Sequence, residues 1–325
     1  MAQADYLVSD VLGKGEFDWD FRCLDEGLMH LVGPYMAQPS GVTSLFCGAL
    51  DELGASSEGN TQGALFVEYG HYATLINDYY TFHPEFFGGD ISRRKAALLT
   101  QLRYAGQHLS NYPRYMLVND SFALPDRQQV DLHDALSGAA VIQGASRGVL
   151  LAWMRARFKS ITREQYLQNA INSMHSYIVF PVALALILAG ADRPAIKNVR
   201  IALAYLAQAM KLLLERETLR QEVFATLAEP TRATLTILSF PGLVFVDQKR
   251  SLDAVLENGA GNESVYEFYV AARDIALADS GESARIYDSA IGQGLDRFEA
   301  TLQRCGILEN WGGGLANALR AGSGA

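Results

Sequence analysis

The segment that most constrains the fold runs from Val199 to Leu214 and is almost wholly apolar, with helical spacing. A second apolar run, Ile178 to Ala191, is 14 residues long and ends at Asp192 and Arg193. About 20 apolar residues are needed to cross a bilayer, so we interpret this run as a core helix and predict no transmembrane segment. A helix that is apolar on every side has to be covered by other helices. The two segments therefore predict a helical bundle with a large core.

Further helices are predicted from the same periodicity. Apolar residues recur at i, i+3 and i+4 from Ser40 to Leu53, and Thr162 has the position of an N-cap before a helix that contains Tyr166. Helical patterns also cover residues 63–80, 265–277 and 284–302. Glycine clusters and most prolines lie between these segments, and no series of short alternating strands is present. We predict an all-α fold.

The chain has no obvious internal boundary. No linker long enough to divide it occurs, so we predict a single domain over residues 1–325, with residues 1–25 and 312–325 peripheral or flexible. The segment from Leu117 to Asp134 is polar and predicts a small irregular subdomain. The N-terminus has no basic start followed by an apolar stretch, so we expect a cytoplasmic protein without a signal peptide.

Charge and cysteine content exclude several functional classes. The net charge is −9 and the pI is near 5.2, which argues against nucleic acid as a partner because phosphate binding needs clustered Lys and Arg. The cysteines, Cys23, Cys47 and Cys305, are far apart, so their spacing predicts neither a zinc site nor a disulfide framework.

One helix tip carries the most chemical information. The helix predicted from Gly63 to Tyr80 is apolar nearly all round and ends in Asn77, Asp78, Tyr79 and Tyr80. An acidic residue among tyrosines at the end of a buried helix is a candidate for binding or catalysis. It is equally a candidate for a simple helix end, with the aromatic residues filling the core.

The order of several segments resembles that of the trans-isoprenyl diphosphate synthases (polyprenyl synthetases) and the related class I terpenoid synthases. The matching order is a helix ending at Gly54, the tip at Asp78, the pair Arg93–Arg94, a buried helix with Gln208, and Arg232 in an Arg-x-Thr-Leu segment. The resemblance covers roughly residues 30 to 305. It implies an isoprenoid synthase-like helical bundle around a central apolar cavity.

The family's metal-binding motifs are degenerate in this chain. The first Asp-rich motif falls on residues 78–82, where only Asp78 is acidic. The second falls on residues 207–215, where Gln208 matches, Lys211 replaces an acid and Glu215 is the last acid. The mid-chain Lys-Thr pair falls near His175–Ser176, and the late Lys becomes Arg232. The segment that should bind isopentenyl diphosphate, residues 39–45, has no basic residue.

The resemblance implies roles for the residues that match. Asp78 and Glu215 are the predicted metal ligands, for fewer Mg²⁺ ions than the family's usual three or for none, and with His175 they are the predicted catalytic residues. The predicted substrate-binding residues are Arg93, Arg94, Lys211, Gln208, Arg232, Tyr79, Tyr80 and Asn77. The predicted substrate is an allylic prenyl diphosphate.

Three functions remain open, of which the third is reuse of the apolar cavity for chemistry outside prenyl diphosphates, with His175 or Asp78 as an acid–base group. The first is ionisation of an allylic prenyl diphosphate, followed by cyclisation or transfer to an acceptor other than isopentenyl diphosphate. The second is a non-catalytic subunit that pairs with an active synthase. The family implies a homodimer, or a heterodimer with a related synthase. Simple structural alternatives also stand: His175 as a satisfied core histidine, Arg93–Arg94 as a surface patch, and residues 215–222 as a solvated charged face.

Overall fold

The fold is seen in a computed structural model that describes residues 41–55, 63, 64, 67, 124–156, 158–220, 239–249 and 265–323. Every regular element in these ranges is a helix. The elements are α4 (Gly41–Glu52), α7 (Asp126–Arg155), α8 (Arg163–Ser173), the π-helical turn η3 (His175–Val179), α9 (Phe180–Leu188), α10 (Arg193–Arg220), α12 (Gly242–Asp247), α13 (Val265–Leu277), α14 (Ser280–Cys305) and α15 (Glu309–Ser323).

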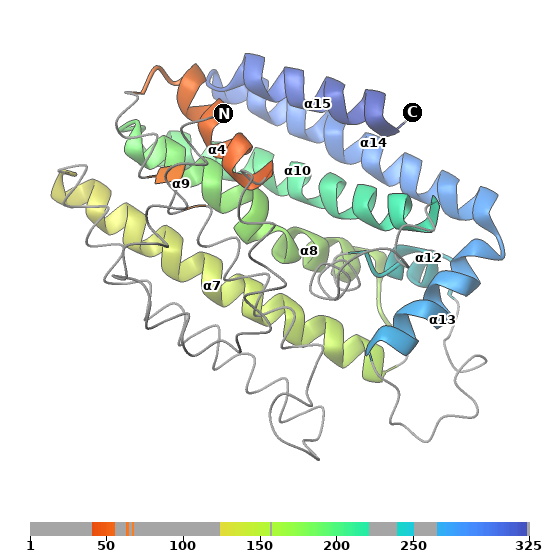
Figure 1. Ribbon diagram of the computed structural model, residues 1–325. Coiled ribbons are helices and arrows are strands. Elements are labelled where there is room, and N and C mark those ends of the chain that lie inside the picture. The colour runs from red at the N-terminus through yellow and green to blue at the C-terminus, as the bar shows by residue number, and fades with distance from the viewer. Residues whose placement is uncertain are drawn as a thin grey trace, which may run out of the picture.

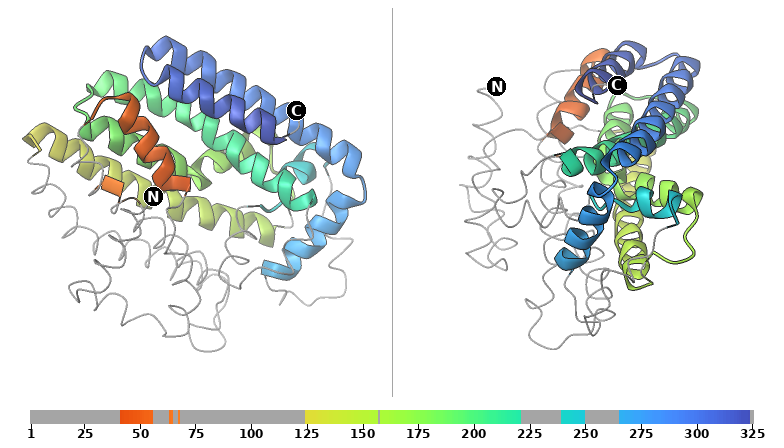
Figure 2. Two further views of the ribbon diagram at one scale, coloured as in Figure 1. Left: turned by 45° about the horizontal axis from the view of Figure 1, so that its top comes forward. Right: turned by 90° about the vertical axis from the view of Figure 1, so that its right-hand side faces the viewer.

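Helix α10 is the centre of the described bundle. It packs along α14 on one side and against α8, η3 and α9 on the other, and α7 covers α8 and α9 in turn. Helix α15 lies on α14, while α4 crosses α9 (Figures 1 and 2). Buried apolar side chains from these helices form one continuous cluster. The largely apolar middle of α10, residues 199–214, follows from this position between two layers of helices.

The link from α7 to α8 is defined by two local features. Phe158 and Ser160 adopt left-handed φ values of 58° and 62°, which turn the chain sharply after α7. Thr162 then begins α8 with a capping box: its hydroxyl accepts from the Gln165 N–H, and the Gln165 side chain accepts from the Thr162 N–H. The predicted N-cap is therefore confirmed.

The sequence predictions of helices are largely confirmed. The segments expected at 40–53, 199–214, 265–277 and 284–302 correspond to α4, α10, α13 and α14. The run from Ile178 to Ala191 is a core helix, with every residue from Phe180 to Ile187 buried. In the part of the chain that the structure describes, no single helix is long and apolar enough to span a bilayer. The bent pair of α8 with η3–α9 meets that test only by combined length and composition.

Two local predictions were wrong. Residues 126–134 are not irregular but form the first turns of α7, whose start follows Pro125 and carries Asp126 in its first turn. The glycines Gly312–Gly314 lie inside α15 instead of between helices. A Cβ on Gly312 would lie 2.0 Å from Cδ2 of Leu302, so the absent side chain lets α15 approach α14 closely.

Candidate functional site

The candidate site is built around Glu215, which lies near the C-terminal end of α10 and is fully buried. Its Oε1 lies 2.6 Å from Nζ of Lys211 and 2.7 Å from the hydroxyl of Tyr166. Its Oε2 accepts a hydrogen bond of 2.8 Å from the Tyr287 hydroxyl. Three donors from α8, α10 and α14 therefore converge on one carboxylate. This network of Glu215, Lys211, Tyr166 and Tyr287 is called the Glu215 cluster below.

Burial dominates the electrostatics of the cluster. Loss of water raises the pKa of Glu215 above its ordinary value, although the Lys211 ammonium and the hydroxyl donors oppose the shift. Burial likewise lowers the pKa of Lys211, opposed by the charge of Glu215. The pKa values of Tyr166 and Tyr287 are raised well above the ordinary value, first by burial and then by the nearby Glu215 charge. Both tyrosines therefore stay protonated and act as donors.

An aromatic group holds Tyr166 in place. The Tyr166 ring lies 5.9 Å from Trp153 and 6.5 Å from Phe158, between ring centroids, and Phe158 stacks on Phe240 at 4.9 Å. The Tyr166 hydroxyl also lies 3.1 Å from the carbonyl oxygen of Phe240. Gly242 faces the same ring so closely that a Cβ there would lie 2.3 Å from Tyr166 Cε2. The phenol is thus fixed by packing before it reaches Glu215.

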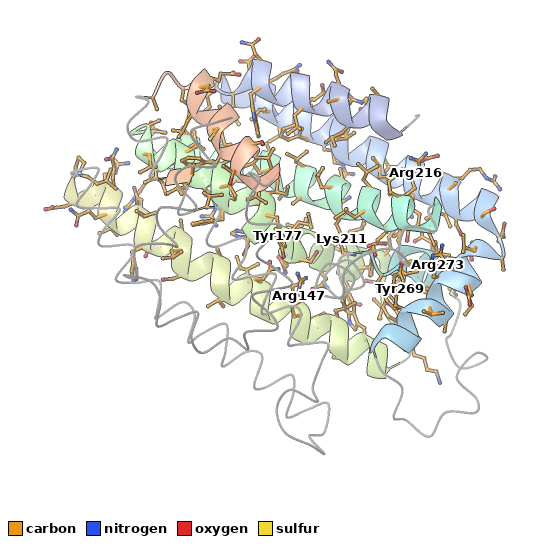
Figure 3. All side chains as sticks on the ribbon, in the orientation of Figure 1. Arg147, Tyr177, Lys211, Arg216, Tyr269 and Arg273 are labelled. Atoms are coloured by element: carbon orange, nitrogen blue, oxygen red, sulfur yellow. The ribbon has the colours of Figure 1, made fainter. Side chains whose placement is uncertain are left out.

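A second cation lies near Lys211. Arg147 of α7 is 2% exposed, and its charge acts on the Lys211 ammonium and lowers the Lys211 pKa further. Figure 3 shows Arg147, Tyr177 and Lys211 in the middle of the bundle, on α7, η3 and α10. One helical turn before Arg147, Gln143 is buried, and neither its Oε1 nor its Nε2 has a hydrogen-bond partner within the described part of the chain. Unsatisfied buried amides are uncommon and mark a place where a polar ligand or water fits.

Arg216 extends the charged region toward α14. Its Nε lies 2.6 Å from Oδ1 of Asp288, and its Nη1 lies 3.3 Å from Oε1 of Glu217. Arg216 is 2% exposed, so the segment after Lys211 is not the solvated charged face that its sequence resembles. That interpretation was wrong for Glu215 and Arg216, because α14 covers this side of α10.

The described part of α10 does not fit a magnesium ion. Mg²⁺ needs carboxylate and water oxygens around it, but both oxygens of Glu215 already accept hydrogen bonds, and a buried ammonium lies 2.6 Å away. No group of three or more His, Cys, Asp or Glu side chains suitable for a metal occurs among the described residues. Coordination of metal by Glu215 in a substrate complex stays a prediction.

The remaining predicted residues divide into two groups. Gln208 is buried on α10, two turns before Glu215, whereas His175 lines a different groove whose wall includes neither Lys211 nor Glu215. The structure therefore brings Lys211 and Glu215 into contact and does not place His175 with them. Outside the described residues lie Asn77, Asp78, Tyr79, Tyr80, Arg93, Arg94 and Arg232.

Sequence reasoning missed three members of the site. Tyr166 was expected only as part of the helix that Thr162 begins, Tyr287 was not singled out, and Arg147 lies in a Gly-rich stretch that carries no phosphate-loop context. Tyr166 and Tyr287 are 49 and 72 residues from Glu215 along the chain. No spacing rule within a helix links positions so far apart. The i, i+4 relation of Lys211 and Glu215 was the one available signal.

Comparison with known proteins defines the class of fold. No protein-family model and no curated protein matches the chain. Among solved structures, a geranylgeranyl pyrophosphate synthase matches with a TM-score of 0.62 at 14% identity, covering 93% of this chain and 92% of that one.

Two further solved structures agree. The geranylgeranyl pyrophosphate synthase from Corynebacterium glutamicum, complexed with isoprenyl diphosphate and magnesium, matches with a TM-score of 0.60 at 13% identity over 99% of this chain and 98% of that one. A polyprenyl synthetase from Streptomyces coelicolor A3(2) has a TM-score of 0.55 at 16% identity over 86% and 84%. The chain therefore has the all-α isoprenoid synthase fold. The resemblance to the trans-isoprenyl diphosphate synthases is confirmed at the level of the fold.

Proposed function

We propose that the protein binds an allylic prenyl diphosphate inside the helical bundle and ionises it, with cations on the α10 side instead of metal-binding carboxylates. The observation that carries the proposal is the Glu215 cluster. At the place of the family's second acidic motif, α10 presents the ammonium of Lys211, beside Arg147 of α7, and a carboxylate that is already hydrogen-bonded. A lysine at this position attracts phosphate oxygens and repels a metal ion.

The reaction proposed is cleavage of the allylic carbon–oxygen bond. The bond breaks heterolytically, the electron pair leaves with the diphosphate, and an allylic carbocation remains. The cation then cyclises and loses a proton, or it is attacked by an acceptor that loses its own proton. Lys211 would offset the charge that develops on the leaving group, together with the predicted Arg93, Arg94 and Arg232. Chain elongation is disfavoured, because residues 39–45 offer no basic side chain for isopentenyl diphosphate.

Turnover is tested with geranyl, farnesyl and geranylgeranyl diphosphates, with and without Mg²⁺. We expect pyrophosphate release together with a hydrocarbon or alcohol product, and loss of release in Asp78→Ala. Failure to turn over any of the three substrates, with Asp78→Ala indistinguishable from the unmodified protein, would rule out the enzymatic proposal.

Binding is tested separately, by calorimetry with a farnesyl thiodiphosphate that resists ionisation. The variant Lys211→Met/Glu215→Gln removes both charges of the buried pair and so avoids leaving one of them alone. We expect about tenfold to hundredfold weaker binding, the range for loss of a charge-assisted contact. Lys159→Met changes an exposed lysine outside the cluster and serves as the control. Equal affinity of the cluster variant and the control would contradict the assigned role of Lys211.

A non-catalytic subunit is the second candidate function. It is favoured because both carboxylate oxygens of Glu215 already accept hydrogen bonds within the protein. A carboxylate that holds α8, α10 and α14 together serves the stability of the fold rather than metal binding. This candidate predicts co-purification with an intact prenyl diphosphate synthase, no pyrophosphate release by the isolated chain, and a change in the partner's product length or rate. Absence of any complex with such a synthase would count against it.

A further inference from the structure

A groove separate from the Glu215 cluster runs between α7, the continuous unit α8–η3–α9, and the N-terminal half of α10. Its volume is about 660 Å³, within the usual range of about 300–1,000 Å³ for small-molecule sites. The floor is apolar and is formed mainly by one side of α8–η3–α9 and by α10. The apolar residues that line it include Ile171, Val179, Ala183, Ile196, Ile201 and Ala204.

The π-helical turn η3 places a histidine in this groove. His175 is the first residue of η3, and it lines the groove while only 7% of it is exposed. Its Nδ1 is buried and has no hydrogen-bond partner among the residues that the structure describes. A buried polar atom without a partner is unfavourable, and π-turns are often found at functional sites. Burial and the nearby Arg200 lower the His175 pKa to about 4, so the imidazole is neutral at neutral pH.

Basic side chains line the α10 wall of the groove. Arg193, Lys197 and Arg200 are spaced by four and three residues, which places them on one side of the helix. Arg193 is already paired with Asp131 of α7 at 2.6 Å. Lys197 is exposed and Arg200 half-buried, and neither forms an ion pair with another described residue.

The acidic side chains of the groove do not balance these cations. Asp131 is engaged by Arg193, and its other oxygen lies 3.9 Å from Arg127. Asp134 is 73% exposed and lies beside His133 at 3.7 Å. The cations of Lys197 and Arg200 and the exposed carboxylate of Asp134 thus remain at the groove, on a chain whose net charge is −9. A local cationic wall on an acidic protein is a feature that selects anions.

We propose that this groove binds a single-chain amphiphile with an anionic head group. The apolar chain lies along the floor formed by α8–η3–α9 and α10. The head group lies against Lys197 and Arg200, and a rotation of the buried His175 ring brings its Nδ1 within hydrogen-bond reach of that head group. Four observations support this chemistry: the volume of the groove, its apolar floor, the cations on one wall and the imidazole that lacks a described partner. The site is independent of the prenyl diphosphate site proposed above.

The first experiment measures binding to the full-length protein by calorimetry, with decyl phosphate below its micellar concentration. Two matched probes separate the contributions: decanol lacks the anion, and butyl phosphate lacks the chain. We expect decyl phosphate to bind at least tenfold more tightly than either probe. Affinity should rise by about fourfold for each added CH₂ group, the factor expected for burial of a methylene. Equal binding of decanol and decyl phosphate would overturn the proposal.

Variants then locate the site. Lys197→Glu/Arg200→Glu should weaken decyl phosphate at least tenfold. Ala204→Trp should block the floor without a change of charge, and His175→Phe should weaken the phosphate probe severalfold. The control Arg285→Glu/Arg304→Glu makes the same net change of charge on α14, on side chains outside the groove, and should leave affinity unchanged. Circular-dichroism melting of each variant verifies that it is folded.

Several outcomes distinguish this proposal from its alternatives. Equal weakening by the α14 control would mean nonspecific charge attraction and would overturn the site. Lys197→Glu/Arg200→Glu could instead dissociate a dimer, seen by analytical ultracentrifugation, and leave ligand binding unchanged. That result would identify the groove as an interface between copies and would overturn the proposal.

Flotation with phosphatidylglycerol vesicles that depends on Lys197 and Arg200 would identify a bilayer as the source of the ligand. Binding of decyl phosphate without flotation would identify a free amphiphile. Unchanged binding in Lys211→Met/Glu215→Gln shows that the result does not depend on the proposed function.

Discussion

The Tyr287 hydroxyl donates a hydrogen bond of 2.8 Å to Oε2 of Glu215, and so joins α14 to α10 inside the core. On its other oxygen the same carboxylate accepts from Tyr166 of α8 and Lys211 of α10. Because all of these groups are buried, water cannot replace a lost partner. The cluster therefore fixes the relative positions of three helices, whatever chemistry the bundle performs.

Removing one tyrosine hydroxyl tests the structural role of the cluster. Tyr287→Phe leaves Glu215 Oε2 without this donor and should lower the free energy of unfolding by about 1–3 kcal/mol, measured by urea denaturation. The matched control is Tyr205→Phe, whose ring is half-buried beside Arg297 and whose hydroxyl makes no hydrogen bond with another described residue. The control should change stability by less than about 0.5 kcal/mol. Equal effects of the two variants would contradict the role of Tyr287.

Breaking the buried ion pair should cost more than replacing both of its members. Lys211→Met leaves the Glu215 charge without its cation and should destabilise by about 3–5 kcal/mol. Lys211→Met/Glu215→Gln leaves no buried charge unpaired and keeps an oxygen acceptor at position 215. This double variant should therefore be clearly more stable than Lys211→Met. The measurement is a double-mutant cycle by denaturant unfolding. Arg285→Met, which breaks an exposed pair with Glu282, is the control and should have little effect. Additive effects at 211 and 215 would argue against the pair.

Gly242 supplies a steric test of the same cluster. A Cβ at this position would lie 2.3–2.6 Å from the Tyr166 ring and hydroxyl, so Gly242→Ala should push the phenol away from Glu215. We expect destabilisation of about 1–3 kcal/mol, the usual cost of overpacking. Gly281→Ala, in α14, meets no atom within 4 Å and should be neutral or stabilising by about 0.5–1 kcal/mol. A neutral Gly242→Ala would show that the Tyr166 contact is not tight.

The buried histidine predicts a specific dependence of stability on pH. The His175 pKa is about 4 in the folded protein against an ordinary value of 6.5, so the unfolded chain binds the proton first as pH falls. The neutral imidazole therefore contributes fully to the free energy of unfolding above pH 6.5. This contribution is lost as the pH falls to 4, by about 3 kcal/mol over the whole interval. His175→Gln should remove this part of the decline, measured as unfolding free energy at pH 7 and pH 4.5. His133→Gln, at an exposed site, should retain it. An equal decline in both variants would contradict the prediction.

The sequence by itself determined the helices, because their signals are local. Apolar spacing of 3.6 residues predicted α4, α10, α13 and α14, and the chemistry of Thr162 predicted the start of α8. The order of the motifs between residues 30 and 305, through their resemblance to the isoprenyl diphosphate synthases, was also sufficient to predict the isoprenoid synthase fold. The glycines at 312–314 misled the prediction, because the close packing of Gly312 on Leu302 of α14 is a contact between two helices that the spacing within one helix does not show.

Only the tertiary structure decided what the polar residues of these helices do. Lys211, Glu215 and Arg216 have the spacing of an exposed charged face, yet α14 and α8 cover them, and burial turns a weak surface pair into a fixed network. Tyr166 and Tyr287 reach Glu215 from 49 and 72 residues away, a relation that no periodicity encodes. The π-turn at His175, which places that side chain in the groove, likewise became visible only in the folded chain.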